Sequence, residues 1–401
     1  MQRPFRRVTI ALAMATTMLF SGLTASSSWA VPDDYPTWAE VEAARNNVAQ
    51  KKIVIAKLDK IIAEQTVQET ALTQEAQLMA EKYNQAKTEV DAITAKVKIL
   101  QGQAESANAQ ANQAKTQLGQ IASQMYRQGA AGTSMNLLLN ADEADDLLYK
   151  LGAQERVAQT SETLYQRSIQ TQKYAESLNS QLKVAKGELA AKAAAAKSAY
   201  NAAQAVANKL TAAVNANKAQ NAVFYAQLAR LKNVSAETER LYQIGLAMEQ
   251  AQNQGTTKPV APELYDVGPA DPAKVAKVIA FAKAQLGEWY VLGGMGPNVW
   301  DCSGLTKASY AAAGIYIGTH SATNQFREMA RQRKLIPLSE AVPGDLMWYS
   351  PTTNIFDGDK EHVVIYLGDD YMIEAPRPGT QVRIVKLRLG RLFPYAGRPS
   401  A

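Results

Sequence analysis

Apolar and alanine positions recur at alternating steps of three and four residues along the first half of the chain. This spacing predicts a helix with one buried stripe, and its persistence over about six heptads is typical of a coiled coil. The alanines in the middle of the stripe indicate that the partner helix approaches closely. The stripe comprises Tyr83, Ala86, Val90, Ile93, Val97, Leu100, Ala104, Ala107, Ala111, Ala114, Leu118, Ile121 and Met125.

A second helical run extends from roughly residue 144 to 250. Glycines at 129 and 132 break the first run before it, so two long helices fold back most simply as an antiparallel pair. We therefore expect a helical arm over residues 31–250 with a hairpin tip near 129–154. The apolar residues of that tip fit either simple closure of the hairpin or a surface that docks a partner. The apolar positions of the second run are Leu147, Leu148, Leu151, Val157, Leu164, Leu178, Leu182, Val184 and Leu189.

Prolines and glycines then gather in residues 251–272, which predicts a linker. It either runs semi-extended or lies ordered across the domain that follows. The hydrophobic period changes from helical to alternating within residues 273–401, so helices precede strands and the fold class is α+β. We expect helices at 273–286, 303–313 and 322–332, and strands at 345–349, 363–367, 371–375 and 382–387.

Residues 1–30 have the features of a secretory signal: three early arginines, an apolar run, and a small-residue site at Ser28-Trp29-Ala30. An uncleaved membrane anchor is the alternative. Cleavage of the secretory signal would lower the formal charge from +6 to +3, because three arginines and no acidic residue are removed with it. An exported chain with so small a charge is a poor candidate for nucleic-acid binding. We expect a secreted protein that works in the cell wall or a periplasm-like space.

The chain contains one cysteine, Cys302, and two histidines, His320 and His362. This set excludes a four-ligand Cys/His zinc site without carboxylates, but a cysteine hydrolase needs only one thiol, one imidazole and an orienting group. Cys302 follows a Gly-rich loop and precedes a helix, where the positive end of the helix stabilises a thiolate. Glu374 falls on the same sheet face as His362, one diagonal away. We therefore expect a thiolate–imidazolium pair oriented by Glu374.

Four stretches resemble the NlpC family of papain-like cell-wall peptidases, in order and in spacing. They are Trp289 to Gly294, Asp301 to Leu305, Pro343 to Leu346, and His362 to Pro376. The resemblance implies a cysteine endopeptidase that cleaves peptidoglycan stem peptides, typically between γ-D-glutamate (or D-isoglutamine) and meso-diaminopimelate, without any metal or organic cofactor.

By that resemblance, Cys302 is the nucleophile and His362 the general base. Glu374 occupies the third position, where the family often has histidine, and this departure is similar to the actinobacterial Rip-type branch. The substrate cleft would be lined by Tyr290, Asp301, Ser303 and Ser321, with His320 as a further candidate. Asp301 and Ser303 fit a purely structural role as caps of the cysteine helix equally well.

A long coiled coil before such a domain resembles secreted division-associated hydrolases, whose arm receives a signal from a membrane complex of the FtsEX type. The resemblance therefore implies peptidoglycan as substrate and such a complex as partner. One alternative is a non-hydrolytic wall-binding or scaffold protein that works through the coiled coil. Another is an amidase or acyltransferase on the same fold. The arm and linker are also long enough to cover the cleft, which predicts that they restrain the enzyme.

Overall fold

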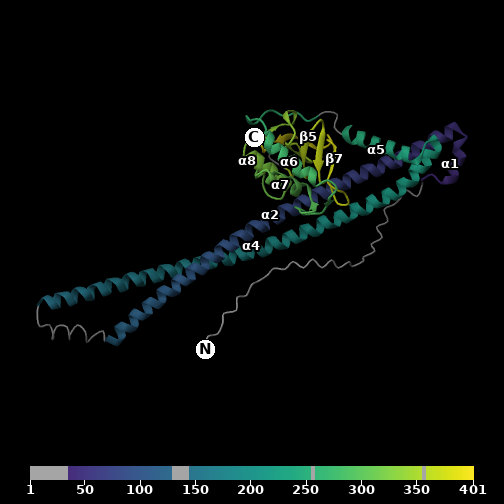
Figure 1. Ribbon diagram of the computed structural model, residues 1–401. Coiled ribbons are helices and arrows are strands. Elements are labelled where there is room, and N and C mark those ends of the chain that lie inside the picture. The colour runs from purple at the N-terminus through teal and green to yellow at the C-terminus, as the bar shows by residue number, and fades with distance from the viewer. Residues whose placement is uncertain (1–34, 129–143, 254–257, 355–357) are drawn as a thin grey trace.

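The computed structural model describes residues 35–128, 144–253, 258–354 and 358–401. A long helical arm crosses beneath a small α+β domain, which sits against one half of the arm's length (Figure 1). The expected signal segment and residues 129–143 of the expected hairpin tip lie outside the described residues. Among the helices that are described, none carries an apolar run that could cross a bilayer.

The described residues of the arm form the helices α1 (Trp38–Arg45), α2 (Val48–Gln128), α4 (Ala144–Lys232) and α5 (Ala236–Asn253). Thr37 starts α1 with a capping box, in which its hydroxyl and the Glu40 carboxylate each satisfy a backbone N–H. α2 and α4 run antiparallel, since Gln65 bonds Gln220 near one end of the pair. Asn108 bonds Asn179 further along. The expected pair of long antiparallel helices is therefore confirmed.

The apolar stripe of α2 faces α4 as its spacing predicts. Val97, Leu100, Ala104 and Ala107 are buried against a set on α4 that includes Leu178. Val184 of the second run points away from this contact and is 60% exposed, because its neighbours Leu182 and Ala185 take the inward positions. The second run is also interrupted earlier than expected: α4 ends at Lys232, and Asn233 adopts a positive φ of 60° before α5 begins.

Three helices form one layer of the C-terminal domain: α6 (Pro272–Ala284), α7 (Cys302–Ala312) and α8 (Ala322–Arg331). Each begins at a side chain that accepts a hydrogen bond from the first turn, namely Asp271, Asp301 and Ser321. A single 3-10 turn, η1 (Leu338–Glu340), follows them. The helix boundaries lie within two residues of the predicted ones.

A six-stranded antiparallel sheet forms the second layer, in the order β3-β8-β4-β5-β6-β7. The strands are β3 (Leu335–Pro337), β4 (Leu346–Tyr349), β5 (His362–Gly368), β6 (Tyr371–Glu374), β7 (Arg383–Lys386) and β8 (Leu392–Gly397). A short parallel pair, β1 (Trp289–Tyr290) and β2 (Val299–Trp300), frames the loop before α7. The sequence predicted β4 to β7 and missed β1, β2, β3 and β8.

The main core lies between the helices and one face of the sheet. Leu305 of α7 and Phe326 of α8 pack there with Trp348 of β4, all at most 4% exposed. The described part of the linker, from residue 258, follows the surface of the domain. Leu264 and Tyr265 pack against the core, and Lys258 forms an ion pair with Asp370. The linker is thus ordered across the domain, which was the second of the two possibilities.

Candidate active site

Cys302 is the first residue of α7 and is 8% exposed. Asp301 holds the helix start, because its Oδ1 accepts the N–H of Gly304 at 2.7 Å and its Oδ2 accepts the N–H of Gly293 at 3.1 Å. The loop before β2 packs directly on this turn: a Cβ added at Gly304 would lie 2.0 Å from the carbonyl oxygen of Gly294. The glycine is therefore what lets the loop and the cysteine helix meet.

His362 begins β5 and Glu374 ends β6. The strands pair with Ile365 opposite Ile373 and Tyr366 opposite Met372, so continuing the register puts Glu374 two residues from the position opposite His362. Nε2 of His362 lies 2.8 Å from Oε2 of Glu374, and both side chains are buried. The diagonal contact inferred from the sequence pattern is therefore present.

Two arginines that the sequence analysis missed surround Glu374. Arg388 donates to both of its oxygens, at 2.9 and 2.7 Å, and Arg383 donates to Oε1. Burial alone would raise the pKa of Glu374, but Arg388 and the hydrogen bond from His362 hold it well below its usual range. Because Glu374 is an ionised acceptor, it fixes the proton of His362 on Nε2. Arg383 could have been found, since it lies opposite Glu374 in the sheet.

The remaining ring nitrogen of His362, Nδ1, is buried and has no hydrogen-bond partner among the described atoms. The N–H of Val363, the next residue, is within hydrogen-bonding reach of the Cys302 sulfur. The thiol and the imidazole therefore come from neighbouring positions on α7 and β5. A neutral Nδ1 at this place is a proton acceptor.

Burial in this arrangement acts against the expected thiolate–imidazolium pair, which stays a prediction. Burial raises the pKa of Cys302 well above that of a free thiol, and the negative charges of Asp301 and Glu81 add to the rise. Burial also lowers the pKa of His362, although Glu374 opposes the change. Burial therefore disfavours the charged form of both groups, and for the thiol it opposes the effect of the positive end of α7.

The other predicted site residues gather around the same thiol. Tyr290 is buried, and its pKa is raised well above its usual value by burial, with the charges of Asp301, Cys302 and Glu81 contributing. Ser303 donates to Asp301 Oδ1 at 3.2 Å, and Nε2 of His320 lies 2.8 Å from the same oxygen. Ser321 caps α8. Asp301 thus has the structural capping role that the sequence left open, while also lying beside the nucleophile candidate.

Helix α2 of the arm runs along the C-terminal domain on the side of α7 and α8 (Figure 1), and it contacts α8 and β5. Glu81 inserts its carboxylate at the start of α8, bonding Ser321, Ala322 and Thr323. One turn later, Asn84 donates to Asp301 Oδ2 at 2.9 Å and to Ser303 Oγ at 3.3 Å.

A further set of contacts fixes α2 on either side of Glu81. Gln77 donates to the carbonyl oxygen of Pro376 at 2.8 Å. Gln77, Glu81 and Asn84 are 8%, 2% and 3% exposed, so the helix seals the surface it covers. Ion pairing of Glu69 with Arg377 extends the contact beyond the site.

Sequence reasoning assigned no role to these α2 residues. The one available signal was a polar stripe at 77, 81, 84 and 88, spaced by four and three on the helix face opposite the apolar stripe.

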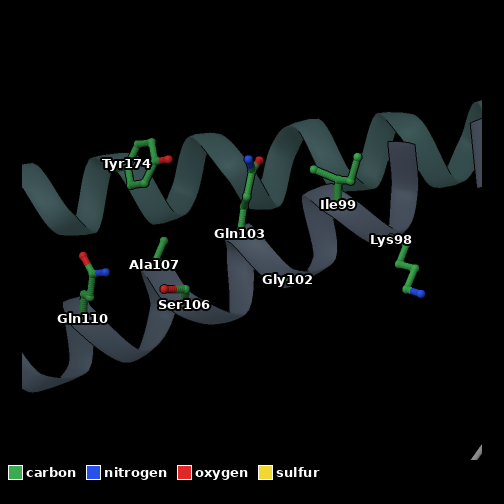
Figure 2. Close-up of a pocket in the computed structure, with 8 residues that line it drawn as sticks. All are labelled: Lys98, Ile99, Gly102, Gln103, Ser106, Ala107, Gln110 and Tyr174. Atoms are coloured by element: carbon green, nitrogen blue, oxygen red, sulfur yellow. The ribbon is translucent and has the colours of Figure 1, made fainter. Parts of the chain in front are cut away.

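The described residues contain no group of three or more His, Cys, Asp or Glu side chains arranged to hold a metal ion. A shallow hollow lies elsewhere, on the arm between α2 and α4 (Figure 2). It is lined by Lys98, Ile99, Gly102, Gln103, Ser106, Ala107, Gln110 and Tyr174, a set without histidine, cysteine or carboxylate side chains.

Residues 287–391 match the NlpC/P60 family. The peptidoglycan endopeptidase RipA of Mycobacterium tuberculosis is 36% identical over 105 residues, which are 26% of this chain and 20% of that protein. A Listeria monocytogenes protein named "Probable endopeptidase p60" is 38% identical over 104 residues, 26% of this chain and 19% of that protein. The chain thus matches about a fifth of the length of these relatives, within its C-terminal domain.

Among solved structures, a hypothetical invasion protein of Mycobacterium tuberculosis aligns with 35% of this chain and 71% of its own, at 27% identity and a TM-score of 0.28. The NlpC/p60 domain of the peptidoglycan hydrolase SagA aligns with 31% of this chain and 97% of its own, at 30% identity and a TM-score of 0.26. Residues 287–391 of the C-terminal domain thus match the NlpC/P60 family, and this stretch is similar in sequence to part of RipA.

Proposed function

We propose that this chain is a secreted peptidoglycan endopeptidase whose reaction runs through Cys302, His362 and Glu374. The observation that carries the proposal is the buried constellation itself: a thiol at the start of α7, beside a strand whose first residue is a histidine held by a carboxylate. The family match and the RipA relationship support peptidoglycan as the substrate. The bond proposed for cleavage joins γ-D-glutamate to meso-diaminopimelate.

In the first half of the reaction, Nδ1 of His362 takes the proton of the Cys302 thiol. The sulfur attacks the γ-carbonyl carbon, and the backbone N–H of Cys302 at the helix start is placed to donate to the resulting oxyanion. The C–N bond then breaks, and the departing amine takes the proton from His362. A thioester between Cys302 and the glutamyl residue remains.

Water completes the reaction. His362 removes a proton from water, hydroxide adds to the thioester carbonyl, and the C–S bond breaks with return of the proton to the sulfur. Glu374 stays ionised throughout, because Arg388 and Arg383 hold it, and its role is to keep Nδ1 aimed at the reacting atoms. No metal or organic cofactor takes part in this scheme.

The arm makes the described form a latent one. Glu81 and Asn84 occupy the surface next to Cys302. The charge of Glu81 adds to the rise in the pKa of the thiol, and Asn84 donates to Asp301, whose charge acts in the same direction. A stem peptide reaches the sulfur only after α2 moves away. A membrane complex of the FtsEX type, pulling or bending the arm during cell division, is the partner we propose for this step.

The test uses the full chain in three forms: unaltered, with Glu81→Ala and Asn84→Ala, and with those changes plus Cys302→Ala. Each is incubated with meso-diaminopimelate-type peptidoglycan, and the released peptides are weighed by mass spectrometry. We expect release by the double variant, much less by the unaltered chain, and none by the triple variant. A double variant that binds the wall without releasing peptides would favour the non-hydrolytic scaffold instead.

A further inference from the structure

The side chain of Arg377 meets the arm at a point beyond the catalytic groups. It lies in the connection between β6 and β7, shortly after Glu374. Its Nη2 donates to Oε1 of Glu69 on α2, and the arginine side chain is only 13% exposed. The other terminal nitrogen, Nη1, is buried and has no hydrogen-bond partner among the described atoms. The arm therefore satisfies only part of a buried guanidinium.

The chemistry of this guanidinium favours a carboxylate that is free to turn. The terminal N–H groups of an arginine form a planar fork that matches both oxygens of one carboxylate. Glu69 engages the fork through a single oxygen, which leaves Nη1 unpaired. Burial lowers the pKa of Arg377, and the charge of Glu69 opposes the change. When α2 moves away, the buried cation loses this acid and is open to another.

The contacts of α2 show where Arg377 lies relative to the reaction. Asn84 contacts the residues on both sides of the thiol, and Glu69, further back along the same helix, reaches Arg377. The charge of Glu374 acts on Arg377, and Glu374 itself is bonded to His362. The surface that α2 covers thus runs from the cysteine helix, past the histidine and its carboxylate, to the guanidinium.

The proposed reaction assigns a half of the substrate to each end of this surface. His362 gives its proton to the departing amine, so the leaving half of the stem peptide lies on the histidine side of the scissile bond. That half begins with diaminopimelate, whose side chain ends in a carboxylate, and in a tetrapeptide stem it ends in the carboxylate of D-alanine.

We infer that Arg377 is a specificity subsite for a carboxylate of the leaving half of the stem peptide, and that Glu69 occupies this subsite while the arm is closed. The two possible sources, the diaminopimelate side chain and the terminal D-alanine, share the chemistry that the fork recognises. This inference rests on the function proposed above and adds a recognition residue on the leaving side of the bond.

The test compares three tetrapeptides on the full chain opened by Glu81→Ala and Asn84→Ala. The reference is L-alanyl-γ-D-glutamyl-meso-diaminopimelyl-D-alanine. The second peptide has L-lysine in place of diaminopimelate and so lacks the side-chain carboxylate, and the third is amidated at its C-terminus. For one of the altered peptides, kcat/KM should fall about tenfold to hundredfold below the reference, because a charge-assisted contact is lost and a buried donor stays unpaired. That peptide identifies the carboxylate that binds.

Arg377→Gln in the opened chain should remove this difference, because it slows only the peptides that carry the bound carboxylate. Arg377→Lys keeps the charge but not the fork and should retain part of the difference. Arg331→Gln is the matched control, since Arg331 is an exposed arginine of α8 that pairs with Glu328, and it should leave the ratios unchanged. An indirect effect through Glu374 would slow all three peptides equally, so the ratios separate it from recognition.

The outcomes distinguish the subsite from the proposed function. Equal cleavage of the three peptides by the opened chain overturns the subsite and leaves the proposed function intact, and so do unequal rates whose ratios Arg377→Gln leaves unchanged. Failure of the opened chain to cleave any of the three overturns both.

Discussion

Replacing Glu81 by glutamine tests the contact between the arm and the start of α8 with a minimal change of side-chain shape. The side chain keeps its length and one carbonyl oxygen, but one carboxylate oxygen becomes an NH₂. In either orientation that group faces a donor at the start of α8, either the Ala322 N–H or the pair formed by the Ser321 hydroxyl and the Thr323 N–H. The closed form loses at least one charge-assisted hydrogen bond and leaves a buried donor without a partner.

The size of the effect follows from two opposing contributions. A hydrogen bond to a charged group contributes about 1.5–3 kcal/mol, and glutamine forfeits it. Glutamine also avoids the cost of burying a charge, which is the reason that the pKa of Glu81 is raised in the closed form. The balance leaves about 1–2 kcal/mol against closure, so the open population should grow by about fivefold to thirtyfold.

Alkylation of Cys302 by iodoacetamide reports this population directly, because the chain has no other cysteine. The alkylation rate of the Glu81→Gln chain should exceed that of the parent by the same factor. Glu105→Gln is the matched control, since Glu105 is an exposed residue of the same helix that accepts a hydrogen bond from Gln101. Equal rates for the two variants would refute the idea that the Glu81 carboxylate holds the arm down.

Three further predictions address other parts of the molecule. Arg388→Met should lower kcat of the opened chain about tenfold to hundredfold with little change in KM, because Glu374 and the ring it orients lose their main charged partner; Arg388→Lys should recover part of the loss. The pH profile of Cys302 alkylation should move to lower pH in the Glu81→Ala, Asn84→Ala chain, since burial and the Glu81 charge both raise the thiol pKa in the closed form; an unmoved profile counts against this. Burial lowers the pKa of Lys360 from 10.5 to about 8, so the folded state releases its proton first and the unfolding free energy of the parent should rise between those pH values. In denaturant titrations, the unfolding free energy of Lys360→Met should rise by about 1–2 kcal/mol less than that of the parent over this pH range. The same pH dependence in both chains would contradict the lowered pKa of Lys360.

Periodicity was sufficient for the arm because one contact repeats along it. The stripe from Tyr83 to Met125 needs only a partner helix, and the next run in the sequence supplies one. The hairpin of β5 and β6 could also be predicted from the sequence, since its short turn fixes the register and therefore brings His362 close to Glu374. Local spacing decides both features.

The strand β8 escaped prediction because Pro394 lies inside it, and proline argues against an internal strand. The sheet accommodates it where the pairing of β4 with β8 shifts register, between Met347 and Tyr349. The ionisation of the site was unpredictable for a different reason. It depends on burial beneath α2 and on the charge of Glu81, which lies 221 positions before Cys302 and meets it only in the folded chain.

The contact between the arm and the domain is made by polar side chains, so the hydrophobic pattern of the sequence did not predict it. Gln77, Glu81 and Asn84 read as an ordinary solvated face of a long helix until the domain is placed on them. The sequence analysis expected that the arm or linker could cover the cleft, on grounds of length alone. The residues that make the contact came from the structure.

The most direct test of the account is the release of diaminopimelate-containing peptides from peptidoglycan by the full chain carrying Glu81→Ala and Asn84→Ala, with and without Cys302→Ala. We predict new glutamate-terminated stem fragments with the thiol present and none without it. Equal release by both chains would contradict a reaction at Cys302, and so would the absence of fragments from an opened chain whose thiol is freely alkylated.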